Sequence, residues 1–170
     1  DITLKTAVVD RCAQSFVLND TELATAALRC LISIGELKRV TSDVLRSFLG
    51  STDACLSSVA YLAVQAMTFE GKFPDGKLFD LILREMQHDA RAGVALVACC
   101  KASEELAGKF LDLMVEKPVV NENVLNALVA SVRYGEDMRS KVRFVMENVK
   151  FEEKLPNLAD NVNSFKKILL

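Results

Sequence analysis

Four similar apolar segments recur along this chain at a nearly constant spacing. They read AALRCLISI, VAYLAVQAM, VALVACCKA and NALVASVRY, and they begin at Ala26, Val59, Val94 and Asn126. In each segment the second residue is alanine and the third is large, and successive alanines lie 32 to 35 residues apart. A small residue beside a bulky one is typical of a helix that packs closely against an equivalent helix. The repeat therefore predicts a fold of stacked, similar helical units.

A second apolar series lies between the members of the first. It reads VLRSFL, LFDLIL, FLDLMV and VRFVME, beginning at Val44, Leu78, Phe110 and Val142, with intervals of 32 to 34 residues. Because two separate series share nearly the same spacing, each repeat is expected to contain two helices. Alternating apolar and polar residues flanked by hairpin turns are absent, so no sheet is expected. The pattern predicts an all-α fold, a right-handed α-solenoid of about five antiparallel helix hairpins.

Helix start signals agree with this pattern. Asp20, Asp53, Asp75, Asp89 and Ser103 stand where the first turn of a helix needs oxygen acceptors. The three prolines and seven glycines are spread thinly, and the segment 71–76 (GKFPDG) is expected to form a turn. The expected helices cover residues 3–17, 20–35, 42–50, 53–69, 76–87, 90–101, 104–117, 122–134, 137–149 and 157–168.

The repeat length and the paired-helix pattern resemble those of HEAT and armadillo repeats over most of the chain. A narrower segment, residues 138–147 (MRSKVRFVME), is similar to the final helix of the middle-domain HEAT modules of translation-initiation and RNA-processing scaffolds. Those modules bind RNA helicases and RNA. This resemblance implies an alternative function, an RNA-associated module in which Arg139, Lys141 and Arg143 contribute to binding.

Length and charge limit the other classes of function. A chain of 170 residues, half of them apolar, can bury the core of a single helical-repeat domain spanning residues 1–170. The net charge of −2 gives no electrostatic reason to expect nucleic acid. The longest uncharged run, Ala54 to Phe69, has 16 residues and is too short for a membrane span. Since the chain begins at Asp1 rather than Met, it is expected to be a fragment of a longer polypeptide.

The five cysteines favour a reducing environment, because none stands in a C-x-x-C spacing. We therefore expect an intracellular, cytoplasmic protein. The adjacent Cys99 and Cys100 share a helix face with Leu96 and are expected to fill the core, the other interpretation being a vicinal disulfide. A structural zinc site would need about four ligands, and His88 is the only histidine, so no metal or other cofactor is expected.

Catalysis is not expected from this sequence. A thiol-dependent enzyme with His88 as the base is the alternative, but the sequence offers no third group to orient such a pair. The aromatic residues of the repeats occur at helical spacing and are expected in the core. These residues are Phe48, Tyr61, Phe79, Phe110 and Phe144.

The leading hypothesis is a non-enzymatic scaffold module that binds a peptide or helix of a partner protein. The first, alanine-rich series is expected to form the inner layer and the concave face of the solenoid. On that face Arg29, Gln65, Lys101 and Arg133 are predicted to line a groove for an acidic or extended segment. Self-association through the ends of the repeat array is a further alternative.

The cations of this predicted groove have a second interpretation. Lys101 with Glu104, and Arg133 with Glu136, have the i,i+3 spacing of surface ion pairs on one helix. Such pairs would stabilise the helices and would not mark a binding site.

Overall fold

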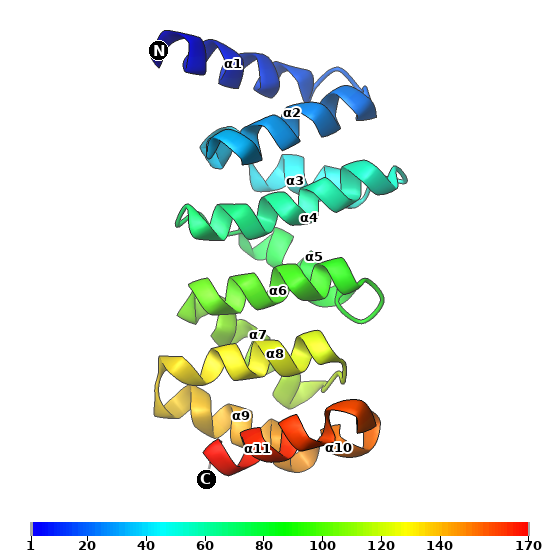
Figure 1. Cartoon of the computed structure of the whole chain (residues 1–170), viewed down its shortest axis with the longest axis vertical. Coiled ribbons are helices and arrows are strands. Elements are labelled where there is room, and N and C mark those ends of the chain that lie inside the picture. The colour runs from blue at the N-terminus through cyan, green and yellow to red at the C-terminus, as the bar shows by residue number, and fades with distance from the viewer. Residues whose placement is uncertain (1, 170) are drawn as a thin grey trace. The chain divides into compact units, whose positions relative to one another are not determined.

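The computed structural model describes residues 2–169, and this part of the chain contains helices and turns but no strand (Figure 1). The predicted all-α class is confirmed. The α-helices are α1 (Ile2–Ser15), α2 (Thr21–Ile34), α3 (Ser42–Leu49), α4 (Ala54–Phe69), α5 (Gly76–Glu85), α6 (Ala90–Ala102), α7 (Glu104–Glu116), α8 (Glu122–Ser131), α9 (Glu136–Asn148), α10 (Phe151–Lys154) and α11 (Ala159–Leu169). Three 3-10 turns, η1 (Leu37–Arg39), η2 (Val132–Tyr134) and η3 (Pro156–Leu158), complete them.

Side-chain caps begin several of these helices at the predicted residues. Asp20, Asp53, Asp89 and Ser103 each accept a hydrogen bond from a backbone N–H in the first turn of the following helix. Asp75 likewise accepts from the N–H of Leu78 at the start of α5, and the Thr41 hydroxyl caps α3. These caps satisfy N–H groups that have no partner within the helix, which explains why local sequence predicted the helix starts well.

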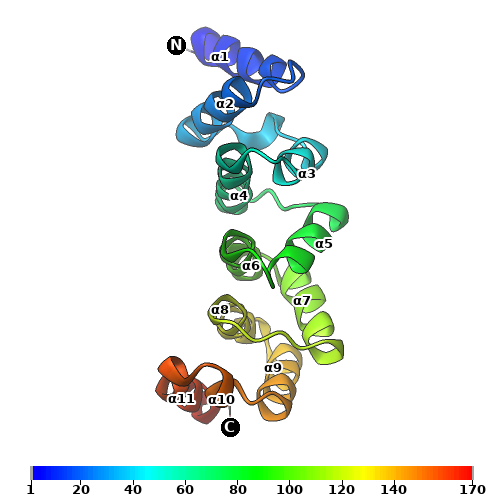
Figure 2. The ribbon, with the colours of Figure 1, turned by 90° about the vertical axis from the view of Figure 1, so that its right-hand side faces the viewer.

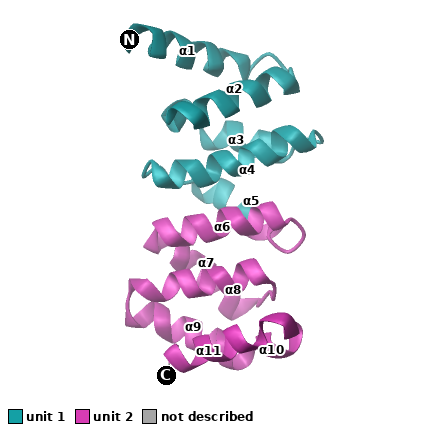
Figure 3. Ribbon diagram, viewed as in Figure 1, with its two compact units in different colours: residues 1–82 teal, residues 83–170 magenta. Residues whose placement is uncertain are grey.

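The chain divides into two compact units, residues 1–82 and 83–170, with the boundary inside α5 (Figure 3). In the first unit α2 packs on α1 and α4, and α3 packs on α4. In the second unit α6 packs on α7 and α8, and α9 packs on α7, α8 and α11. Figure 2 shows α6 and α8 one above the other on one side of the second unit, with α7 and α9 on the other side. The prediction that residues 1–170 form a single domain stays a prediction.

Hydrogen bonds join equivalent positions of neighbouring repeats in the first unit. The Lys72 ammonium donates to the carbonyls of Leu37, Lys38 and Val40 at 3.3, 3.1 and 2.6 Å. The Glu70 carboxylate accepts from the N–H of Leu37 at 3.3 Å. The partners in these bonds lie 32 to 35 residues apart, which matches the spacing of the sequence repeat.

The second unit repeats this arrangement with different side chains. The Asn121 amide donates to the Met86 carbonyl at 3.1 Å, and the Asn123 amide donates to the Ala90 carbonyl at 3.3 Å. The Tyr134 hydroxyl donates to the Lys101 carbonyl at 2.9 Å. These partners lie 33 to 35 residues apart. In both units, therefore, successive repeats are in contact at corresponding positions.

The core contains four of the five aromatic residues that the sequence assigns to it, namely Phe48, Tyr61, Phe79 and Phe110. The prediction for Phe144 is wrong, because 49% of its surface is exposed. On α9 the buried residues are Met138, Val142, Val145 and Met146. Phe144 lies two positions after Val142, which places it about 200° around the helix and away from the core.

The final helix packs back onto the second unit. Helix α11 contacts α9 and α10, and it buries Val162, Phe165 and Leu169. The Arg143 guanidinium of α9 donates to the Leu169 carbonyl at 2.6 and 3.0 Å. This arginine therefore caps the C-terminal end of α11.

Candidate protein-interaction surfaces

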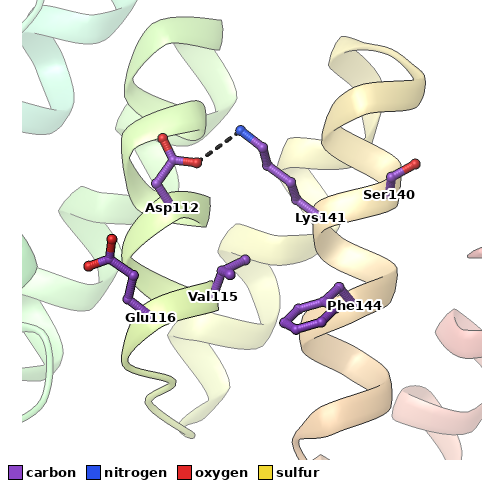
Figure 4. Close-up of a pocket in the computed structure, with 6 residues that line it drawn as sticks. All are labelled: Asp112, Val115, Glu116, Ser140, Lys141 and Phe144. Carbon is purple, nitrogen blue, oxygen red and sulfur yellow. Dashed lines mark hydrogen bonds and ion pairs between the residues drawn. The ribbon is translucent and has the colours of Figure 1, made fainter.

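Helices α7 and α9 border a surface groove in the second unit, with a volume of about 530 Å³ (Figure 4). We call it the α7–α9 groove. Its lining consists of Asp112, Val115 and Glu116 from α7, and Ser140, Lys141 and Phe144 from α9. Since α7 and α9 pack directly on each other, side chains of both helices form its walls.

The apolar part of the α7–α9 groove consists of Val115 and Phe144. The exposed fractions are 40% for Val115 and 49% for Phe144. Figure 4 shows the valine between the two helices on the side that faces the phenylalanine. Fully burying an apolar side chain stabilises a contact by about 1.5–3 kcal/mol relative to leaving it exposed. Two such side chains in a concave surface can therefore contribute substantially to binding a partner.

The polar part of the groove is held by an ion pair between the two helices. The Lys141 ammonium lies 2.9 Å from the Asp112 carboxylate and 3.7 Å from that of Asp137. The hydrogen bond to Asp112 raises the pKa of Lys141, so this lysine stays protonated at neutral pH. The ion pair lies beside the apolar patch and is partly exposed to solvent.

Glu116 gives the groove a carboxylate that is not neutralised. It is exposed at the end of α7, one turn after Asp112, and makes no hydrogen bond or ion pair within residues 2–169. The lining contains two carboxylates, Asp112 and Glu116, and one ammonium group, Lys141, so its net charge is negative. The groove is thus suited to a partner that combines an apolar side chain with a cation.

The three basic residues suggested by the RNA-binding resemblance do not form one patch. Successive residues of a helix are about 100° apart, so Lys141 lies on the opposite side of α9 from Arg139 and Arg143. Lys141 pairs with Asp112, Arg143 binds the end of α11, and the Arg139 guanidinium donates to the Val132 carbonyl at 3.4 Å. All three side chains therefore have partners within the chain.

The four residues predicted to line the concave face are divided between the two units, two in each. Arg29 on α2 is exposed, and Gln65 on α4 is half-buried, with its amide donating to the Tyr61 carbonyl at 3.4 Å. In the second unit Lys101 lies in the last turn of α6 and Arg133 lies in η2, and both are exposed.

Tyr134 contacts both Lys101 and Arg133. Its hydroxyl bonds to the Lys101 carbonyl, and the Arg133 guanidinium lies 5.1 Å from the centre of its ring. The half-buried Val97 and the exposed Val129 precede these cations by one turn on α6 and α8. We call this surface, formed by Val97, Lys101, Val129 and Arg133, the α6–α8 face.

The alternative interpretation of these cations as ion pairs on one helix is wrong. Helix α6 ends at Ala102 and α7 begins at Glu104, so Lys101 and Glu104 belong to different helices. Likewise Arg133 lies before Gly135, whose φ of 120° separates η2 from α9. The i,i+3 spacing therefore does not bring either pair onto a common helix.

The adjacent cysteines are core residues, as predicted. Neither Cys99 nor Cys100 has any exposed surface. Burial raises the pKa of Cys99 to about 12 and raises that of Cys100 as well, so both remain thiols at neutral pH. His88 is exposed in the turn before α6. Among residues 2–169, no three histidine, cysteine or acidic side chains are grouped so that they could hold a metal ion.

Comparison of the chain with models of protein families, with curated protein sequences and with solved structures finds no match. Across residues 2–169, no helix has the length and apolar character needed to cross a membrane.

Proposed function

We propose that this chain is a non-enzymatic protein-binding module, a right-handed α-solenoid of the HEAT and armadillo kind. The hydrogen bonds between positions one repeat apart support this proposal, as does the packing of α2 on α4, α6 on α8 and α7 on α9. Its role is to dock a helix or extended segment of a partner protein. An intracellular, cytoplasmic location fits the unpaired cysteines.

The α7–α9 groove is the observation that carries this function. It places two exposed apolar side chains, Val115 and Phe144, beside an ion pair and the unpaired carboxylate of Glu116. The proposed partner segment inserts a large apolar residue between α7 and α9 and directs a lysine or arginine to Glu116. The proposed binding site lies on α7 and α9, which belong to the second apolar series of the sequence. The sequence repeat had predicted a binding face on the first, alanine-rich series.

Selection from a displayed library of helical peptides, followed by affinity measurements on variants, tests this proposal. We expect the selected peptides to combine a leucine, methionine or phenylalanine with a basic residue three or four positions away. Val115→Asp should weaken their binding by about tenfold or more, because it places a charge in the apolar contact. The matched control is Val129→Asp on α8, since Val129 is similarly exposed, at 44%, and lies outside the groove.

The pair of variants separates the two surfaces. Loss of binding with Val115→Asp and normal binding with Val129→Asp would support the α7–α9 groove. The reverse pattern would assign binding to the α6–α8 face. Binding that neither substitution weakens would contradict both sites. Circular dichroism of each variant shows whether its helices are retained.

The α6–α8 face is a second candidate binding site, because residues of the same kind stand at equivalent positions of two successive repeats. Val97 with Val129, and Lys101 with Arg133, are each 32 residues apart, and α6 packs on α8. Its cations suit an acidic segment, opposite in charge to the partner proposed for the groove. Peptides selected with acidic residues would therefore favour this face.

The alternative of an RNA-associated module receives less support. Two of its three basic residues, Lys141 and Arg143, are engaged with Asp112 and with the end of α11. A salt-dependent affinity for RNA that is lost in an Arg139→Ala/Lys141→Ala/Arg143→Ala variant would restore this alternative.

A further inference from the structure

Helix α4 exposes two large apolar side chains on one side. None of its 16 residues, from Ala54 to Phe69, is charged. Beyond its first two residues, the exposed residues of α4 are Leu62, at 52%, and Phe69, at 89%. They are seven positions apart, which places them on the same side of the helix and about 10.5 Å apart along its axis. Gln65 and Ala66, which lie between them, are half-buried. This side of α4 is therefore largely apolar and carries no charge.

Hydrogen bonds hold the end of α4 from which Phe69 projects. The next three residues, 70–72, donate their backbone N–H groups to carbonyls in the last turn of α4 at 3.0 to 3.3 Å. The side chains of Glu70 and Lys72 then bond to the backbone of residues 37–40, which follow α2. Since this end of α4 is already anchored, a partner that covers Phe69 does not have to order it first.

Helix α2 packs on α4 in the same unit and supplies charges beside the apolar side chains (Figure 1). Glu22 and Arg29 are exposed and seven positions apart, so they share one side of α2. Neither side chain makes a hydrogen bond or ion pair within residues 2–169. We call the surface formed by Glu22, Arg29, Leu62 and Phe69 the α2–α4 face.

The register between the two helices follows from the repeat. The N–H of Leu37, just after α2, bonds to Glu70, just after α4, and these residues lie 33 positions apart. Since both helices end at this contact, they run side by side in the same direction. Arg29 and Leu62 are also 33 positions apart, so they lie at the same level. Glu22 lies two turns before this level, and Phe69 lies two turns after it.

We propose that the α2–α4 face docks an amphipathic helix of a partner protein. Two large apolar residues of that helix, seven positions apart, contact Leu62 and Phe69. Charge complementarity sets its polar residues, because a carboxylate is needed beside Arg29 and a lysine or arginine beside Glu22. Along the partner helix the order is a basic residue, then an acidic residue next to the first apolar residue, then the second apolar residue. This site lies in the first unit and does not depend on the α7–α9 groove.

The spacing of the contacts favours a helix over an extended segment. On a partner helix, positions i and i+7 lie on one side and are about 10.5 Å apart, which matches the spacing of Leu62 and Phe69. An extended chain advances about 3.3 Å per residue, and its successive side chains point to opposite sides. It covers the same distance in about three residues, whose first and last side chains point in opposite directions. A single extended segment therefore fits the two contacts poorly.

Selection from a displayed library of helical peptides tests this proposal. The bait is the full chain carrying Val115→Asp, so peptides that need the α7–α9 groove are not recovered. We expect peptides with two large apolar residues seven positions apart, and with an acidic and a basic residue also seven apart. Phe69→Asp added to the bait should weaken their binding by about tenfold or more, because it places a charge in the apolar contact. The matched control is Leu4→Asp, since Leu4 is also exposed, at 66%, and lies on α1.

An exchange of charges tests the polar contacts. With Glu22→Lys and Arg29→Glu added, the bait should bind a selected peptide about threefold to tenfold more weakly. It should prefer a second peptide in which the acidic and basic residues are exchanged. Circular dichroism of each variant shows whether its helices are retained.

Three results would overturn the proposal. One is a set of selected peptides that bind the Phe69→Asp protein as tightly as the bait. Another is a charge-exchanged protein that keeps the peptide preference of the bait. The third is a selection that recovers no peptide. Because the bait carries Val115→Asp, none of these results bears on peptide binding at the α7–α9 groove.

Discussion

Gly93 lies in α6 beside Asn123 of α8, at the contact between these two helices. A Cβ atom at this position would stand 2.6 to 2.9 Å from the side chain of Asn123, whose amide also bonds to the Ala90 carbonyl. Glycine is therefore required here for close packing of two equivalent helices. The same close approach keeps Asn123 within reach of the preceding repeat.

Gly93→Ala should lower the free energy of unfolding by about 1–3 kcal/mol, because the added methyl group overpacks the contact between α6 and α8. Chemical denaturation measures this change. The control is Gly76→Ala, since no atom lies within 4 Å of the Cβ position there, and its effect should be below about 1 kcal/mol. Adding Asn123→Gly should recover part of the loss caused by Gly93→Ala. Additive effects of the two substitutions would contradict the proposed clash.

The Asn121 side chain makes two hydrogen bonds at the start of α8. Its carbonyl oxygen caps α8 by accepting from the N–H of Val124 at 2.8 Å, and its amide donates to the Met86 carbonyl. Asn121→Ala should destabilise the protein by about 1–2 kcal/mol, because both bonds are lost. Asn121→Asp should cost less, since the cap remains. Equal losses in thermal or chemical denaturation of the two variants would show that the bond to Met86 contributes most of the effect.

Three residues show how far side-chain environments follow from the sequence. Cys99 and Cys100 were correctly placed in the core, because equivalent positions of the other repeats are mostly apolar. The prediction for Phe144 is wrong, because the position of a residue on the helix, and not its aromatic character, determines whether it is buried. The spacing of Met138, Val142 and Val145 already defines the buried side of α9, and Phe144 departs from it. That departure indicates that Phe144 is exposed, but it does not indicate which side chains of α7 lie beside it.

At the scale of elements, the helix caps link stability to pH. Asp89 caps α6 and also accepts from the Arg91 guanidinium at 2.7 to 3.1 Å. These hydrogen bonds, above all those from the Arg91 side chain, lower the pKa of Asp89 below its ordinary value. A carboxyl group with a lowered pKa stabilises the folded state fully above its unfolded pKa. This contribution is lost as the pH falls through the folded pKa.

Asp89→Asn should therefore destabilise the protein at pH 7, by about 1 kcal/mol, because the amide retains a capping oxygen and loses the charge. The difference between the wild type and this variant should shrink as the pH falls below about 4. Urea denaturation at a series of pH values measures it. A difference that stays constant down to about pH 2 would contradict this role of the charge.

The elements that sequence predicted well are those that depend on local signals. Caps and the repeat define α2 through α9, with bounds a few residues from those observed. Helix α10 and the turn η3 were not predicted, because they depend on the burial of Phe151 against the rest of the second unit and on Pro156. The α7–α9 groove was missed for a related reason. Its lining depends on which side chains of two separate helices come together, and no local pattern specifies this.

At the scale of the whole molecule, the repeat predicts that stability is governed by contacts between neighbouring hairpins. Gly93→Ala disturbs a contact in the second unit. It should therefore speed amide exchange in α6 and α8 and leave exchange in α1 to α3 of the first unit nearly unchanged. Hydrogen exchange followed by mass spectrometry resolves these segments. A uniform acceleration across both units would show that the chain opens as one cooperative body instead.

The most direct test of protein binding through the α7–α9 groove is a charge swap with a selected peptide. Titration should show that Glu116→Lys weakens binding of a lysine-bearing peptide by about threefold to tenfold, because the free carboxylate of the groove becomes a cation. A peptide with glutamate in place of that lysine should bind the Glu116→Lys protein better than it binds the wild type. If Glu116→Lys leaves the affinity for both peptides unchanged, the partner does not bind in this groove.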